Sequence, residues 1–294
     1  MNLEEEVRDG YTVSKKMKQI WAVQIDLVKK LLEVCQKHNL KIWADGGTLL
    51  GTIRHKGYIP WDDDIDMAMM REDYDKLIAI GQKEFKHPYF LQSGYVEEFN
   101  RGFARLRNSN TTGIMPCDIN LNFNQGIFID IFVYDAIPDN KFDLKLLFLK
   151  QKLRRAPLDI KLYGCTNIFH PKQFLATFYT KLYFIFYNYS SAFKKFDDEF
   201  KKHKISENRD IACIAFRPKL LAIFRRNKDW YNETIMMPFE NIMIPVPNGY
   251  DAILTKQYGD YMKPAKVPAL HDNNIIWDVE RPYKIVLNEL KSKE

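Results

Sequence analysis

A cluster of four aspartates constrains this 294-residue chain more than any other feature. Three are consecutive, at Asp62, Asp63 and Asp64, and Asp66 follows after one intervening residue. Carboxylates held this close repel one another, and folded proteins commonly offset such repulsion with a cation. The alternative is a solvated acidic turn after Pro60, which is the commoner use of a bare run of charge. The residues around the cluster therefore decide between a metal site and a solvated turn.

A glycine pair, Gly46 and Gly47, precedes the cluster. Residues 40–44 are short and partly apolar, which predicts a strand that enters a tight turn at the glycines. We predict a short helix over residues 48–54, opened by Thr48. Glycine lets the backbone approach a ligand closely, and the free N–H groups at a helix N-terminus attract phosphate. The neighbours of the aspartates thus favour a site for phosphate and metal.

A further carboxylate, Asp130, lies in the middle of the apolar stretch 125–134, which predicts a buried strand. Asp64 and Asp66 are one residue apart, so on an extended strand their side chains point to the same side. If Asp130 lies on an adjacent strand with the same facing, three carboxylates converge and suit one or two magnesium ions. The alternative for Asp130 is a salt bridge to a nearby arginine.

The order of elements predicts an α+β fold. We expect one domain over residues 1–294, with a nucleotidyltransferase-like mixed sheet and flanking helices. Within it we predict an N-terminal helical region over residues 1–40 and a helical basic insertion over residues 141–235. The other expected elements are a strand over 65–70, a helix through about Phe85 with Asp73 as its N-cap, short strands within 239–250 and a helix over 251–261.

Basic charge is segregated within this chain. Residues 141–228 carry 20 Lys and Arg against 7 Asp and Glu, a net charge of +13 in a chain of net charge +6. Inside this stretch, apolar residues recur at helical spacing from Phe174 to Phe186. Core packing is the favoured use of that face, and contact with an anionic membrane is the alternative. No nucleic acid partner is expected, since no zinc-finger or RNA-binding signature is present.

Residues 46–66, read as a string, closely resemble the defining motif of the LicD family, which includes the fukutin-related proteins. Further blocks resemble that family in order, at residues 71–75, 104–107, 126–132, 239–240 and 258–262, with His271 after them. The resemblance extends from about residue 13 to 271 and is loose over 141–235. Two departures are visible: Val133-Tyr134 stands where the family often has Pro-Leu, and Asn241 where it often has Gly.

The resemblance implies a metal-dependent phosphotransferase. We expect transfer of phosphocholine from CDP-choline to a sugar hydroxyl of a cell-surface glycan, or of a lipid-linked glycan precursor, with release of CMP. Asp64, Asp66 and Asp130 are expected to hold Mg²⁺ or Mn²⁺. One carboxylate, either Asp130 or Asp63, is expected to accept the proton of the attacking hydroxyl.

Other residues are expected to bind the substrates. Gly46, Gly47 and Thr48 would cradle phosphate oxygens. Arginines are expected to contact the transferred group, namely Arg54, Arg105 and Arg107. Two histidines, His55 and His271, are weaker candidates for substrate binding. An aromatic box for choline would draw on Trp43, Tyr58, Trp61 and Trp230.

Alternatives to this function remain open. The same chemistry with CDP-ribitol or CDP-glycerol is the nearest, and a transferred nucleotide would fit the same fold. A non-catalytic glycan-binding protein and a basic RNA-binding protein belong to other classes. The chain begins without a secretory signal, so we expect a cytoplasmic protein that contacts the inner face of a membrane peripherally.

Overall fold

The sheet that carries most of the core is built around one long strand, β8 (Ile127–Ala136), in which every residue is buried. The computed structural model describes residues 1–164, 171–215, 221–264 and 275–292. Strand β8 pairs in parallel with β4 (Asp66–Met70) and antiparallel with β6 (Ala104–Asn108). The other strands of this sheet are β3 (Trp43–Ala44), β5 (Tyr89–Gln92), β9 (Asp210–Ala212) and β10 (Arg226–Asn227).

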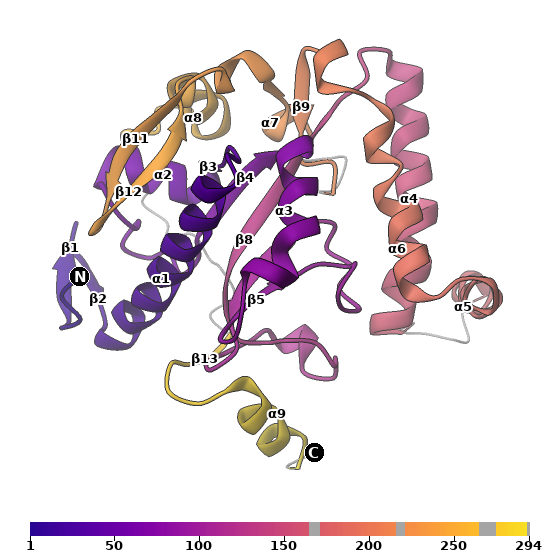
Figure 1. The fold of residues 1–294 in the computed structure, drawn as a ribbon, viewed down its shortest axis with the longest axis horizontal. Helices are drawn as coiled ribbons and strands as arrows, with labels where there is room; N and C mark the ends of the chain where they lie inside the picture. The colour runs from indigo at the N-terminus through magenta and orange to yellow at the C-terminus, as the bar shows by residue number, and fades with distance from the viewer. Residues whose placement is uncertain (165–170, 216–220, 265–274, 293–294) are drawn as a thin grey trace.

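Parallel and antiparallel pairs occur in the same sheet, and helices flank it (Figure 1). The α+β prediction is therefore confirmed. The helices are α1 (Lys15–Lys37), α2 (Gly46–His55), α3 (Arg71–Glu84), α4 (Lys141–Tyr163), α5 (Pro171–Phe186), α6 (Tyr189–Asp197), α7 (Leu221–Phe224), α8 (Tyr250–Tyr258) and α9 (Tyr283–Lys291). The described residues also form three small two-stranded sheets: β1 (Glu6–Arg8) with β2 (Tyr11–Val13), β11 (Thr234–Phe239) with β12 (Ile242–Pro247), and β7 (Thr112–Ile114) with β13 (Ile276–Asp278).

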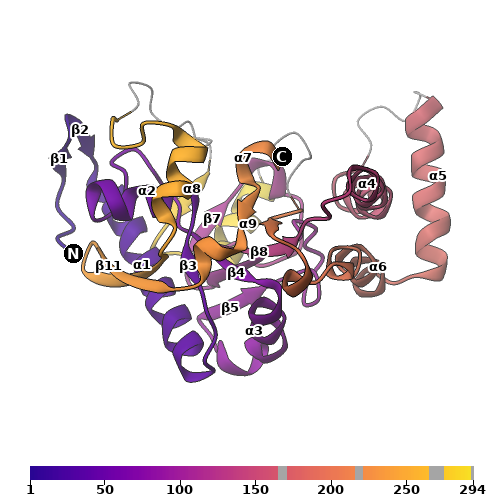
Figure 2. The same cartoon turned by 90° about the horizontal axis from the view of Figure 1, so that it is seen from above.

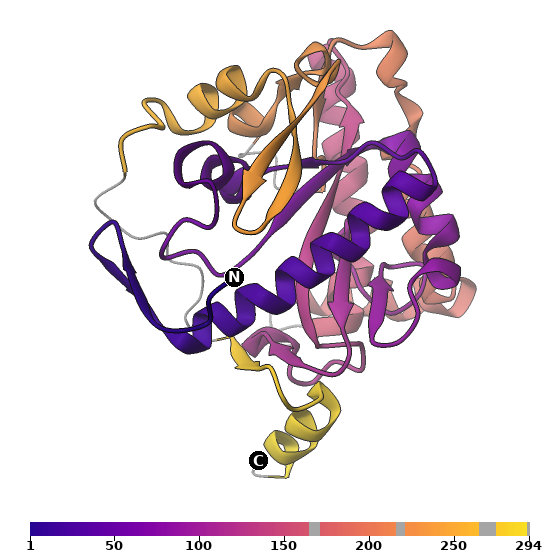
Figure 3. The ribbon, with the colours of Figure 1, turned by 60° about the vertical axis from the view of Figure 1, so that its left-hand side comes forward.

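Helix α1 has the amphipathic pattern that its sequence predicts. The Ser14 hydroxyl caps its N-terminus by accepting a hydrogen bond from the Met17 N–H at 3.2 Å. Most of its apolar stripe is buried, and Trp21 and Leu27 are fully buried. The helix lies diagonally across the strands of the central sheet (Figure 3), so this stripe supplies one wall of the core.

Two helices begin earlier than the sequence predicts. Helix α2 starts at Gly46 instead of Thr48, and α3 starts at Arg71 instead of Asp73. Asp73 does not cap α3, because its carboxylate accepts a hydrogen bond from the Lys41 N–H and pairs with Lys76. The glycine pair is thus the first turn of α2 itself.

Helices α4, α5 and α6 stand together beside the sheet, at the end away from α2 and α8 (Figures 1 and 2). They share a second apolar cluster, formed by residues such as Leu158, Phe196 and Phe200. Within the segment predicted to be helical and basic, β9 and β10 are strands that extend the central sheet. Whether residues 1–294 fold as a single unit stays a prediction.

The expectation for residues 174–186 is wrong in one respect. Instead of packing into the core, most of the apolar side chains of α5 are exposed. None of the described helices combines the length and the apolar character that crossing a membrane requires.

Candidate active site

A pocket of about 390 Å³ opens where the first turn of α2, the acidic segment before β4 and helix α8 meet. It is lined by Asp45, Gly46, Gly47, Leu50, Arg54, Ile59, Trp61, Asp62, Asp64, Asp66, Phe132, Phe224, Gln257, Tyr258, Tyr261 and Lys263. Residues far apart in the sequence therefore contribute to one cavity. Its walls combine carboxylates, a helix N-terminus, two basic side chains and several aromatic rings.

The glycine pair makes room for two of the carboxylates. Gly46 has a φ of +50°, and a Cβ there would lie 2.8 Å from an Asp66 oxygen. A Cβ at Gly47 would lie 2.5 Å from an Asp62 oxygen. Any larger residue would push these carboxylates away, since real Cβ atoms do not approach oxygen this closely. The glycines thus bring Asp62 and Asp66 against the start of α2.

The strand register places the predicted carboxylates side by side. Asp66 is directly opposite Asp130 in the parallel pair of β4 and β8. Arg105 is opposite Asp130 on its other side, in β6. Its guanidinium forms a salt bridge with Asp130, with Nε 2.6 Å from Oδ1, and it stacks 3.8 Å from the centre of the Phe128 ring. The salt bridge considered as the alternative for Asp130 is therefore present, and Asp130 also lies beside Asp66. Its role as a metal ligand stays a prediction.

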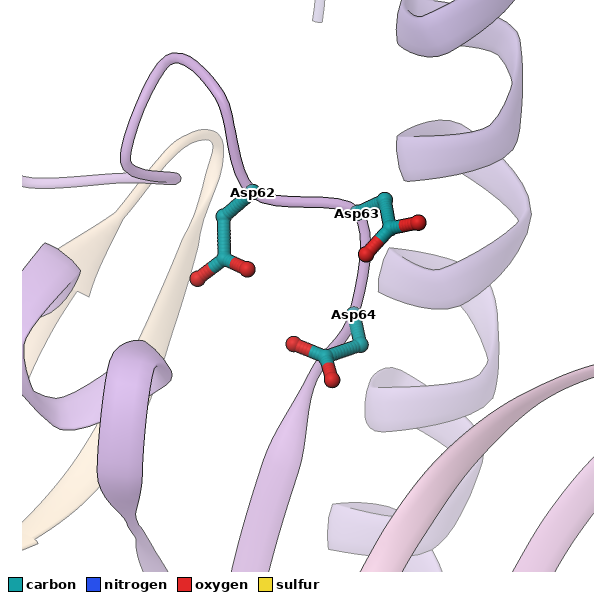
Figure 4. Close-up of side chains that lie close together, drawn as sticks. All are labelled: Asp62, Asp63 and Asp64. Atoms are coloured by element: carbon teal, nitrogen blue, oxygen red, sulfur yellow. The ribbon is translucent and has the colours of Figure 1, made fainter. Parts of the chain in front are cut away.

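The three consecutive aspartates also gather their oxygens. Among the described residues, Asp62, Asp63 and Asp64 form a group with one carboxylate oxygen each, all within 4.8 Å of one another. Figure 4 shows the carboxylates of Asp62 and Asp64 on the same side of the backbone segment. Helix α1 holds this segment, because the Trp21 Nε1–H donates to the Asp62 carbonyl at 3.0 Å and the Gln24 amide to the Asp63 carbonyl at 2.7 Å.

The ionised forms of the aspartates at this site are destabilised by burial and by the charge of neighbouring carboxylates. Burial, together with the charge of Asp63, raises the pKa of Asp62 to about 7. Burial also raises the pKa of Asp66 well above its ordinary value, and the charges of Asp64 and Asp130 act in the same direction. A divalent cation would offset both effects, and an all-carboxylate oxygen set is what Mg²⁺ and Mn²⁺ prefer. The residues present therefore fit such a metal.

Asp45 is a further member of the cluster that the sequence did not reveal. It is the residue before α2, and it lines the pocket. Its carboxylate forms a buried salt bridge with Arg226, with Nη1 2.5 Å from Oδ1, and accepts a hydrogen bond from the Tyr134 hydroxyl. Arg226 also donates to the Tyr231 hydroxyl at 2.7 Å. Tyr134, one of the two departures from the LicD motif, thus supports the residue at the start of α2.

Two predicted phosphate ligands have different positions from those expected. Thr48 is buried, and its hydroxyl accepts a hydrogen bond from the Asp66 N–H at 2.8 Å, so it ties α2 to β4. Arg107 is also buried, and it donates to the Gln92 side chain at 2.6 Å and to the Gly126 carbonyl at 2.8 Å. Burial lowers its pKa well below the ordinary value for arginine. Neither side chain lines the pocket.

The remaining basic candidates divide between the pocket and its edge. Arg54 lines the pocket and donates to the Tyr261 carbonyl at 2.9 Å, which links α2 to the chain after α8. His55 Nε2 lies 3.1 Å from Asp9 in the turn between β1 and β2. Burial lowers the pKa of His55, and the neighbouring Arg54 adds to this. His271 lies outside the described residues.

The aromatic candidates are also divided. Trp43 and Tyr58 are buried in the core, whereas Trp61 lines the pocket. Tyr258 and Tyr261 line it as well. Both lie in the block 258–262 that resembles the LicD family, but their position in the pocket depends on the tertiary fold that brings the end of α8 there.

Comparison with known proteins agrees with this geometry. Residues 39–150, which include α2, β4 and β8 and hence the whole acidic cluster, match the family described as LicD/FKTN/FKRP, nucleotidyltransferase domain. The resemblance to the LicD family is confirmed. The lipopolysaccharide cholinephosphotransferase LicD of Haemophilus influenzae is 27% identical over 78% of this chain and 85% of that protein.

Two shorter matches support the same assignment. An uncharacterized protein of Rickettsia prowazekii is 31% identical over 47% of this chain and 48% of its own length. Human ribitol 5-phosphate transferase FKRP is 35% identical over 48 residues, which are 16% of this chain and 10% of that protein. The names of these two transferases, LicD and FKRP, both describe transfer of a phosphorylated alcohol.

Proposed function

We propose that this protein transfers phosphocholine from CDP-choline to a sugar hydroxyl of a glycan or lipid-linked glycan, with release of CMP. One observation carries the proposal: a LicD-type helix N-terminus with its glycine pair lines a single pocket together with the carboxylates of Asp62, Asp64 and Asp66. The extent of the match to a cholinephosphotransferase supports choline as the alcohol. Ribitol phosphate and glycerol phosphate are the alternative cargoes, and the short match to a ribitol phosphate transferase supports testing them.

Asp64, Asp66 and Asp130 would hold Mg²⁺ or Mn²⁺, with Asp62 beside them. When bound, the ion would neutralise charge on the diphosphate of the donor. The first residues of α2 line the same pocket. A helix N-terminus has free N–H groups and the positive end of the helix dipole, which favour a phosphate there. Arg54 offers a further positive group on the pocket wall.

The transfer itself needs position more than covalent help from the protein. The acceptor oxygen forms a bond to the phosphorus of phosphocholine, the bond from that phosphorus to CMP breaks, and CMP leaves with the electron pair. The proton of the hydroxyl passes to a carboxylate of the cluster. Asp130 and Asp63 are the two candidates, and Arg105 would hold Asp130 in place while it accepts the proton.

The aromatic lining supports a cationic cargo. A quaternary ammonium is attracted to the faces of Trp and Tyr rings, and Trp61, Tyr258 and Tyr261 line the pocket. A ribitol chain, by contrast, needs hydrogen-bonding partners for its hydroxyls. We therefore expect Trp61→Ala to lower CMP release from CDP-choline more than from CDP-ribitol, by about 5- to 30-fold if roughly 1–2 kcal/mol of cation–π attraction is lost.

Release of CMP from CDP-choline, with Mg²⁺ and a crude glycolipid fraction, tests the function directly. We expect release by the wild type and its loss in Asp66→Asn, which keeps the side-chain shape and removes the charge. Asp143→Asn is the matched control, because Asp143 is exposed on α4 and outside the pocket. Release from CDP-ribitol or CDP-glycerol alone would change the cargo, and release unaffected by Asp66→Asn would refute the assignment of the cluster.

A further inference from the structure

Helix α5 presents an apolar face to solvent. Phe174, Phe178, Ile185 and Phe186 are each more than 60% exposed, and Leu175 and Leu182 are exposed as well. At about 100° per residue, these side chains and the exposed Tyr179 between them fall within an arc of about 140° on the helix. One continuous side of α5 is therefore apolar and uncovered by the described parts of the chain.

The opposite side of α5 accounts for its attachment to the protein. Tyr183 and Thr180 are buried there, and Tyr183 belongs to the apolar cluster shared with α4 and α6. In Figure 2, α5 forms the outer edge of the molecule, with α4 and α6 on its inner side and α2 and α8 at the far end. The exposed arc and the pocket are thus separate surfaces.

Charge distinguishes among the partners that such a face could contact. The chain around α5, residues 141–228, has a net charge of +13, whereas the rest of the chain is net negative. Lys181 is exposed at the edge of the apolar arc, where its ammonium group can reach outward while its stem covers apolar surface. A second copy of the same face would bring two strongly basic segments together, which is unfavourable. An anionic lipid surface matches both the apolar arc and the charge.

We propose that α5 is a membrane-docking helix, which lies in the plane of an anionic lipid surface with its exposed arc among the acyl chains. An interfacial helix of this kind combines a wide apolar face with basic flanks. Because the pocket lies at the other end of the molecule, docking concentrates the protein at the membrane and leaves the pocket open. This proposal does not depend on which donor the pocket accepts.

Flotation of the full chain with vesicles tests the proposal. We expect the wild type to float with vesicles of phosphatidylcholine and phosphatidylglycerol, and to bind several-fold less to phosphatidylcholine alone or at 0.5 M salt. The double substitution Phe178→Glu with Ile185→Glu is expected to reduce the bound fraction at least about tenfold, since two charges would have to enter the interface. Ile285→Glu, on exposed α9, is the matched control and should float like the wild type.

The readouts separate docking from other uses of the face. Both altered side chains are exposed, so the melting temperature and CMP release in detergent solution should not change. The proposal is overturned if the wild type fails to float with anionic vesicles, or if the double variant floats equally well. It is also overturned, in favour of a dimer interface, if light scattering shows a dimer that the double variant loses while no vesicle binding occurs.

Discussion

Gly47→Ala separates the role of the glycine pair from the stability of α2. The second residue of the helix has ordinary helical geometry, so alanine in place of glycine should by itself stabilise the helix by about 0.5–1 kcal/mol. The new Cβ, however, would lie 2.5 Å from an Asp62 oxygen, so that side chain has to move. Moving it off its rotamer costs about 0.5–1.5 kcal/mol. The two effects nearly cancel, and we expect the free energy of unfolding to change by less than about 1 kcal/mol.

Activity should respond very differently. A displacement of about 1 Å in a positioned group can lower the rate roughly 100-fold, so we expect Gly47→Ala to lower kcat/KM for CMP release by about that factor. Urea unfolding and CMP release, measured on Gly47→Ala, Asp62→Ala and the double variant, form a double-mutant cycle. With Asp62 shortened to alanine, Gly47→Ala should become stabilising by about 0.5–1 kcal/mol. Full activity in Gly47→Ala, or the same stability change in both backgrounds, would refute the proposed contact between Gly47 and Asp62.

Three further outcomes are expected. Arg226→Met leaves the Asp45 carboxylate buried without its arginine, so the free energy of unfolding in urea should decrease by about 3–5 kcal/mol. Arg225→Met is the control: it removes a partly exposed salt bridge to Asp210 and should lower the free energy of unfolding by no more than about 1 kcal/mol. Removal of divalent ions with EDTA should abolish CMP release, and Mg²⁺ or Mn²⁺ should restore it; full activity after chelation would contradict the metal assignment. Since burial lowers the pKa of His55, the contribution of His55 to stability should fall as pH drops below about 6.5, so in thermal melts the stability of the wild type relative to His55→Gln should decrease over that range.

The sequence was sufficient to predict a buried strand around Asp130 and to suggest that this strand lies beside the one that carries Asp66. An aspartate in the middle of an apolar strand has few explanations, and alternation along a strand fixes which side it faces. The side-by-side positions of Asp66 and Asp130 follow from these two rules once the strands pair in parallel. The start of α2 was misplaced by two residues, because glycine is a poor helix former and the tertiary contacts of Asp62 and Asp66 override that preference.

Other parts of the site depend on contacts that local pattern does not encode. The pair of Asp45 and Arg226 joins residues from opposite halves of the chain. Arg107 belongs to a basic motif, yet the fold buries it against Gln92. Amphipathic spacing also predicts that α5 has an apolar face. Whether that face is buried or exposed depends on which side of α5 packs against α4 and α6, and local sequence does not determine this.

The arrangement of arginines explains where the pocket can accept positive charge. Asp66 lies between two flanking carboxylates, Asp130 and Asp45, whose charges both raise its pKa. Each flanking carboxylate has its own arginine, Arg105 on one side and Arg226 on the other, and these salt bridges are buried. The arginines therefore compensate the outer carboxylates within the protein itself. The central carboxylate, which lines the pocket and has a raised pKa, would gain most from the divalent cation that we propose, since buried negative charge is stabilised mainly by a close positive partner.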